Sequence, residues 1–221
     1  MANKNRLAKY YQRRLAALLA AQFVMGFAIV LLRFALFGND PFSCMNLGFA
    51  NVSGLSFGTC SILFNLVAIV PIFILDKNYI QIGTLINMFM VGPIVDAYYY
   101  VLSNFPMLVA PTLEERIFLL ISSVVVCCLG ASLYMMPQMG IGPYDAIGWI
   151  LAARSKGRLS FRSARVIEDF CAVTIGFING SIVHIGTLIM AFGTGPLVAF
   201  FNEYVSIPLI YNGKKGLVKA R

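Results

Sequence analysis

Charged side chains inside apolar segments are the residues of this chain best suited to chemistry. Arg165, Glu168 and Asp169 are spaced so that they share one face of a helix, where the arginine can pair with either acid. Carboxylates within an apolar layer usually pair, face a cavity, or carry protons or cations. Desolvation and mutual repulsion both favour a protonated acid here. The pattern therefore predicts a coupling group, with a structural ion pair between helices as the alternative.

Two further polar residues in apolar segments belong with this group. Asn65 aligns with Asp169 when the two halves of the chain are superposed, so only one half would carry a titrating side chain at that position. Asp96 lies in another apolar run. The candidate coupling residues are therefore Arg165, Glu168, Asp169, Asn65 and Asp96.

The halves are related by an internal repeat. The stretches IGTLINMFMVGP (Ile82–Pro93) and IGTLIMAFGTGP (Ile185–Pro196) are identical at eight of twelve positions. Each places a Gly-Pro pair roughly 16 Å into an apolar segment, near the middle of a bilayer. Proline removes a helical hydrogen bond, and in a membrane such breaks are tolerated where protein or a water-filled cavity surrounds them. The repeated pair favours a site at the breaks, with simple packing kinks as the alternative.

A second repeated feature is a broken stretch after the first apolar segment of each half, Gly38–Gly54 and Gly140–Ser160. Each contains a proline suited to the first position of a short helix, whose free backbone N–H groups attract anions. Discontinuous helices at matched positions indicate a transporter's substrate site. An amphipathic surface helix anchored by Trp149 is the alternative. The predicted binding or pore-lining residues are Pro41, Gly92, Pro93, Gly142, Pro143, Asp145, Gly195 and Pro196.

Composition identifies an integral membrane protein. Of the 221 residues, 59% are hydrophobic and 12% are charged, and the mean hydropathy is +0.81. The net charge of +8 comes from bases at the ends of apolar segments, which indicates membrane lipid rather than nucleic acid as the partner. The five cysteines lack metal-ligand spacing, and His184 is the single histidine. We therefore expect no metal, no cofactor and no enzyme activity.

Charge placement predicts the topology. If both ends of the chain are cytoplasmic, every Lys and Arg except Arg33 and Arg116 faces the cytoplasm. The expected fold is all-α, with six transmembrane helices in two inverted three-helix repeats, each carrying a re-entrant or interfacial half-helix after its first span. The expected spans are Leu15–Phe37, Phe57–Leu75, Ile80–Leu102, Ile117–Met136, Ala164–Gly180 and Ile185–Ile207. The corresponding units are a basic N-terminus (1–14), repeat 1 (15–102), a connecting loop (103–116), repeat 2 (117–207) and a basic C-terminus (208–221).

The second half also resembles a known family. The order GIGPYD (Gly140–Asp145), LSF (Leu159–Phe161), IGT (Ile185–Thr187) and a downstream Gly195-Pro196 is similar to the bacterial YczE/YyaS/YitT family of integral membrane proteins. The first half departs from that pattern at Asp40-Pro41-Phe42-Ser43, which lacks the acid found at Asp145. The resemblance implies a bacterial membrane protein of uncertain transport function.

Together these features predict a small secondary transporter in the bacterial cell membrane that moves a small solute through a midplane site between the repeats. An anionic solute, proton coupling and a homodimer are options that the residues leave open. A passive channel of hourglass type would need no titrating carboxylate. A membrane scaffold or regulatory subunit would bind a protein rather than a solute.

Overall fold

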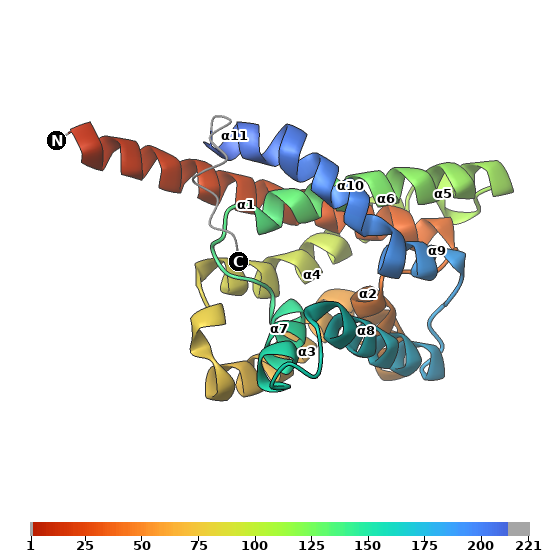
Figure 1. Cartoon of the computed structure of the whole chain (residues 1–221). Helices are drawn as coiled ribbons and strands as arrows, with labels where there is room; N and C mark the ends of the chain where they lie inside the picture. Colours follow the sequence, from red (N-terminus) through yellow and green to blue (C-terminus); the bar gives the residue numbers. More distant parts are fainter. Residues whose placement is uncertain (1, 212–221) are drawn as a thin grey trace.

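The structure, a computed structural model, describes residues 2–211 and is built from helices (Figure 1). The expected basic C-terminus therefore lies almost wholly outside the described residues. The elements are α1 (Ala2–Ala35), α2 (Pro41–Ser53), α3 (Phe57–Leu75), η1 (Lys77–Tyr79), α4 (Ile82–Leu102), α5 (Pro106–Val109), α6 (Leu113–Met135), α7 (Pro143–Arg154), α8 (Phe161–Ile178), α9 (Ile185–Leu188), η2 (Ile189–Gly193), α10 (Thr194–Phe201), η3 (Asn202–Ser206) and α11 (Ile207–Tyr211).

Five helical segments within the described residues are long and apolar enough to cross a membrane. They are Tyr10–Ala35, Phe57–Leu75, Ile82–Leu102, Leu113–Met135 and Ile185–Tyr211. The chain is thus an all-α, multi-pass membrane protein, as composition predicts. The expected fifth span corresponds to α8, which has 18 residues but is not among these five segments. Its sequence holds four charged residues, and these lower its apolar character.

The helices pack in a pattern that exchanges partners between the two halves of the chain. Helices α1 and α6 lie side by side, α4 also packs against α1, and α10 packs against α6. The short helix α2 packs against α8 of the second half as well as α3 of its own, and the short helix α7 packs against α3 of the first half as well as α8 of its own. Figure 1 shows α2, α3, α7 and α8 grouped on one side of the long α1–α6 pair. Each half therefore completes the packing of the other.

Local sequence explains where these helices begin. Ser56 and Ser160 precede α3 and α8, and each side chain accepts a hydrogen bond from a backbone N–H of the first turn. Thr112 and Glu115 form a capping box at the start of α6. Both short helices begin with proline, as the sequence predicts. With 13 and 12 residues, α2 and α7 measure only about 18–20 Å, which is shorter than a bilayer core.

The two Gly-Pro pairs differ from the expectation of matched breaks. Helix α4 continues through Pro93, and Gly92 packs so tightly on α3 that an added Cβ would lie 2.8 Å from the Gly58 Cα. In the second half, π-helical turns η2 and η3 flank α10, whereas an added Cβ on Gly195 would meet no atom within 4 Å. The close contact with α3 explains the glycine of the first pair, so that glycine serves helix packing.

Candidate functional site

The repeated IGT motifs hold the loops that lead into the short helices, and each motif holds the loop of the other half. The backbone N–H of Gly83 donates to the Met139 carbonyl, and that of Gly186 donates to the Phe37 carbonyl, both at 2.8 Å. Met139 belongs to the loop before α7, and Phe37 to the loop before α2. The motif is thus a reciprocal clasp between halves.

Both clasped loops turn sharply at a glycine. Gly38 and Gly140 follow the bonded carbonyls and have φ values of +89° and +112°, which favour glycine over residues with a Cβ. A Cβ on Gly140 would lie 2.6 Å from the Thr84 hydroxyl oxygen, and a Cβ on Gly38 would collide with that of Thr187. The glycines therefore serve both the turn and the close approach of the threonine.

Two arginines reinforce the same loops from the far ends of α1 and α6. The Arg14 guanidinium donates to the carbonyls of Pro137 and Gln138 at 2.6 and 3.1 Å. The Arg116 guanidinium donates to the carbonyls of Ala35 and Leu36 at 3.0 and 3.1 Å. Each arginine thus satisfies carbonyls at the end of the neighbouring helix, where cations are favoured.

The tips of the two short helices meet inside the protein. Phe42 and Tyr144 each directly follow the first proline of a short helix, and their ring centroids lie 4.8 Å apart. Tyr144 is buried, with Met45 of α2 and Ala172 of α8 in the same apolar cluster. The predicted residues Pro41 and Pro143 are buried beside this contact. The structure therefore brings the two predicted helix N-termini together.

Beside the α7 tip lies a network centred on Arg165 of α8. Its guanidinium contacts Asp145 Oδ1 at 2.6 Å and Asp169 Oδ1 at 3.1 Å. The Tyr144 hydroxyl donates to Asp169 Oδ1 at 2.7 Å, and the Arg165 guanidinium carbon lies 4.8 Å from the centre of the Tyr144 ring. One arginine thus binds two carboxylates, one from each of the helices α7 and α8.

Glu168 is buried next to this network but does not join it. The residue is 8% exposed, and its carboxylate, unlike that of Asp169, has no ion-pair partner among the described residues. Helix α7 approaches it at Gly148, where an added Cβ would lie 2.9 Å from Glu168 Oε2. The two adjacent acids of α8 therefore differ, because Asp169 is paired and Glu168 is not.

The α2 tip is polar in a different way. Asp40 caps the helix by accepting the Ser43 N–H on Oδ1 at 3.1 Å, while its Oδ2 has no described partner. Three neighbours are buried with oxygens that are likewise unpartnered among the described residues, namely Asn39 Oδ1, Ser43 Oγ and Asn46 Oδ1. The α2 tip therefore gathers hydrogen-bond acceptors, which the sequence analysis did not identify.

Other predicted site residues lie away from the tips. Asp96 Oδ2 accepts the Gly58 N–H at 2.9 Å and so caps α3. Asn65 is buried and donates to the Ser61 carbonyl at 2.9 Å. Gly195 and Pro196 are exposed on α10. A surface hollow lined by Asp76, Asn78, Tyr79 and Trp149 lies toward the opposite end of α7.

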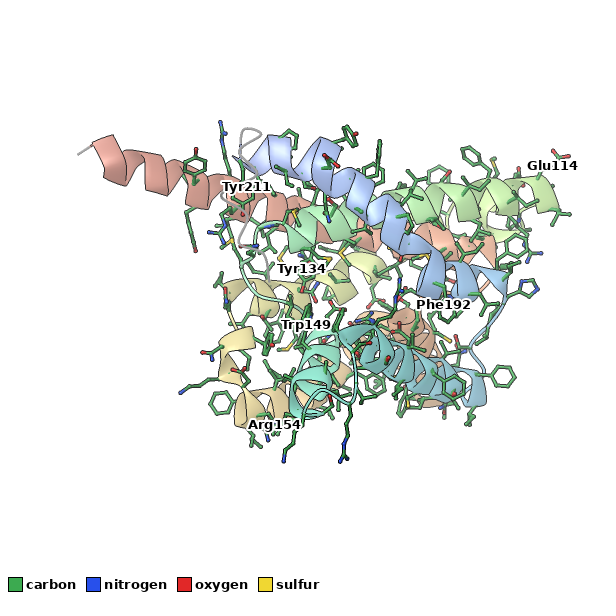
Figure 2. The ribbon with its side chains drawn as sticks, in the orientation of Figure 1. Glu114, Tyr134, Trp149, Arg154, Phe192 and Tyr211 are labelled. Carbon is green, nitrogen blue, oxygen red and sulfur yellow. The ribbon has the colours of Figure 1, made fainter. Side chains whose placement is uncertain are left out.

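Gly142 is the predicted glycine with a clear place at the α7 tip. An added Cβ there would lie 2.8 Å from the Asn87 Oδ1 and 3.3 Å from the Tyr134 hydroxyl oxygen. Figure 2 shows Tyr134 on the inner side of α6, whereas Arg154 points outward from the far end of α7. Arg154 donates to the Leu75 carbonyl at 3.2 Å. The polar centre and the basic edge of α7 are therefore at opposite ends of one short helix.

Comparison with known proteins places the chain in a family whose function is unknown. Residues 12–203 match the model described as "Family of unknown function (DUF6198)". A protein of Haemophilus influenzae described as uncharacterized is 25% identical over 195 residues, covering 88% of this chain and 85% of that protein. No solved structure matches. These descriptions do not name the YczE/YyaS/YitT family, so that resemblance stays a prediction.

Proposed function

This chain belongs to the DUF6198 family, and we propose that it is a small secondary transporter that couples movement of a small solute to protons across a bacterial cell membrane. The observation that carries the proposal is the charged network at the meeting point of two short helices. Arg165, Asp145 and Asp169 lie there within an otherwise apolar, multi-pass chain. Charged groups within membrane-spanning segments mark solute or proton pathways, and interrupted helices mark transporter binding sites.

The same proposal includes an inverted relation between the halves, with both termini cytoplasmic. The exchanged packing of α2 on α8 and α7 on α3 supports this relation, as do the reciprocal clasps. Arg14 and Arg116 support it further, because each braces the other half's loop from the opposite end of the α1–α6 pair. In this arrangement α8 is the fifth of six spans, and it tolerates Arg165, Glu168 and Asp169 because these side chains face α7 rather than lipid.

Glu168 is the side chain best placed to carry the proton. Asp169 is occupied by Arg165 and Tyr144, so its charge is balanced within the protein. Glu168 has no such partner among the described residues, and a buried carboxylate without a partner is costly. Uptake and release of a proton would therefore change the charge of this region at Glu168 first, with Asp169 as the fixed partner of the arginine.

The test uses purified protein in vesicles that enclose a pH-sensitive dye, with a panel of small metabolites added outside. We expect at least one solute to move protons through the native protein. Glu168→Gln should abolish that proton movement and retain solute exchange, whereas Glu114→Gln, at an exposed position on α6, should behave as native. If the solute still drove proton movement through the Glu168→Gln protein, the assignment of Glu168 as the proton carrier would be contradicted. Solute flux without any proton movement would favour the channel.

A further inference from the structure

We propose that the solute is a small organic cation rich in N–H donors, a guanidinium or primary ammonium compound, and that the α2 tip holds it through Asp40, Ser43, Asn46 and Asn39. This inference rests on the proposed transport function and names the substrate class of the same site. It replaces the anionic solute that helix N-termini alone would favour.

The geometry of α2 gathers the four acceptors. Ser43 and Asn46 are three residues apart in α2 and share one face of the helix, whereas Asn39 lies two residues before its first residue. Ser43 and Asn46 are fully buried, and Asn39 is 5% exposed. The Asp40 carboxyl lies against the same turn, because its other oxygen accepts the Ser43 N–H. Four residues at or just before the first turns of α2 therefore carry unpartnered buried oxygens.

The hydrogen bond made by the Asn46 side chain shows which of its two polar atoms lacks a partner. Its amide nitrogen donates to the Phe42 carbonyl at 2.8 Å, so the oxygen is the atom without a described partner. The same holds more widely, because every unpartnered buried side-chain atom among the described residues is an oxygen. A buried acceptor without a donor costs roughly 1–3 kcal/mol. A ligand that supplies several N–H donors would relieve that cost at the carboxylate and amide oxygens, which can only accept, whereas the Ser43 hydroxyl can also donate.

The charge of the region also favours a cation. Because Arg165 already binds Asp145 and Asp169, neither Asp40 nor Glu168 has an ion-pair partner among the described residues, so each would need a cation or a proton to be neutral within the protein. A solute cation at Asp40 and a proton at Glu168 would each supply that balance. This balance of charge is the one expected for a transporter that exchanges a solute cation for a proton.

Ligand shape is set by the rings at the helix tips. Phe42 and Tyr144 stand 4.8 Å apart at the point where α2 meets α7, and aromatic faces attract cations. The Tyr144 ring already faces the Arg165 guanidinium, so within the protein one planar cation is bound beside an aromatic ring at this place. A small group with several N–H donors would match the unpartnered oxygens of the α2 tip.

Calorimetric binding to the purified full-length protein tests the inference with matched probes. Guanidinium and methylammonium should bind saturably at low millimolar concentration, whereas tetramethylammonium, which has the charge but no N–H donor, should bind at least 10-fold more weakly. Acetate and sodium serve as the anion and bare-ion probes. Equal binding of tetramethylammonium or sodium, or stronger binding of acetate, would overturn the donor-rich cation.

The decisive variant is Asp40→Asn, because asparagine also caps helices well and should leave α2 intact. It should weaken methylammonium binding at least 10-fold, while Asp76→Asn, which alters the cap of η1, should leave it unchanged. Ser43→Ala removes one acceptor and provides a second variant if Asp40→Asn does not fold. Unchanged binding in the folded variants would overturn the assignment to α2. Binding that depends on Asp40 without any flux would instead reject transport, and proton-coupled flux of another solute without cation binding would reject this inference alone.

Discussion

The tips of α2 and α7 occupy matching places in the two halves of the chain and carry different chemistry. At the α7 tip, Tyr144 and Asp145 join Arg165 in a network of paired charges. At the α2 tip, the corresponding places hold Phe42 and Ser43, and the polar atoms there are unpartnered oxygens among the described residues. The charged groups at the α7 tip are paired within the protein, whereas the α2 tip carries unpartnered oxygens among the described residues. The two halves therefore share one backbone arrangement, which we call the frame, whereas the side chains at the tips of their short helices differ in chemistry.

The frame itself is nearly identical in the two halves. Gly83 and Gly186 bond opposite loops at the same distance of 2.8 Å, and Arg14 and Arg116 brace the same two loops. These contacts use backbone groups, glycines and guanidinium forks, which depend on geometry rather than on solute identity. The contrast between a common frame and divergent tips can be tested by substitutions at matched positions.

The largest effect is expected at Arg165. Arg165→Gln would leave the carboxylates of Asp145 and Asp169 without their cation, at a cost of roughly 2–3 kcal/mol in the free energy of unfolding. Ser61 is the aligned position in α3, and Ser61→Ala should cost less than about 1 kcal/mol. Thermal and denaturant unfolding in detergent would measure both. Equal losses at the two positions would contradict the division of roles between the tips.

A smaller effect is expected at the loop glycines, and it should be the same in both halves. Gly38→Ala and Gly140→Ala would each add left-handed backbone strain and a collision with a threonine hydroxyl, costing roughly 1–2 kcal/mol. Gly54→Ala is the matched control, because Gly54 has φ of +71° but open space around it, so strain acts there alone. Unfolding of the three variants would separate crowding from strain. A loss at only one of Gly38 and Gly140 would break the common frame.

The smallest effect is expected from exchanging the bracing arginines for lysine. Arg14→Lys and Arg116→Lys keep the charge and lose the two-pronged hydrogen bonding to carbonyls, so each should cost about 1 kcal/mol of unfolding free energy. Unfolding midpoints of the single and double variants would measure the effect. Similar losses would confirm equivalent braces, whereas a neutral result at Arg116 alone would show that only one loop depends on its arginine.

Much of the frame could be predicted from the sequence, because an internal repeat can be recognised by comparing the two halves residue by residue. The IGT motifs, the prolines at Pro41 and Pro143 and the apolar spans all follow from local patterns, and the structure has helices at those places. The exchange of partners between halves could not be predicted, because a repeat does not specify which copy its residues will contact. Arg14 and Arg116 occupy matching positions in the two halves, and each contacts the loop of the other half. The count of charges in the sequence analysis used these two residues only to assign sides of the membrane.

The chemistry of the tips was harder to predict. The sequence placed Arg165 within reach of Glu168 and Asp169, but the choice of Asp169 depends on side-chain direction, and the contact with Asp145 depends on α7 packing against α8. Gly92, which is predicted to line a site, packs closely on Gly58, because small residues permit helices to touch. The acceptors of α2 were missed, since Asn and Ser at a helix start are common caps.

The reciprocal clasps have a consequence for how the chain is made. The Phe37 carbonyl accepts a hydrogen bond from the Gly186 N–H, and the Ala35 carbonyl accepts one from Arg116. Both donors lie far along the chain from the loop that they hold, so they are synthesised much later. Domains made of such distant contacts fold slowly, because long loops must close before the contacts form. The first half alone therefore lacks the partners that fix its short helix. The contacts that hold the α2 loop can therefore form only once the second half has been synthesised.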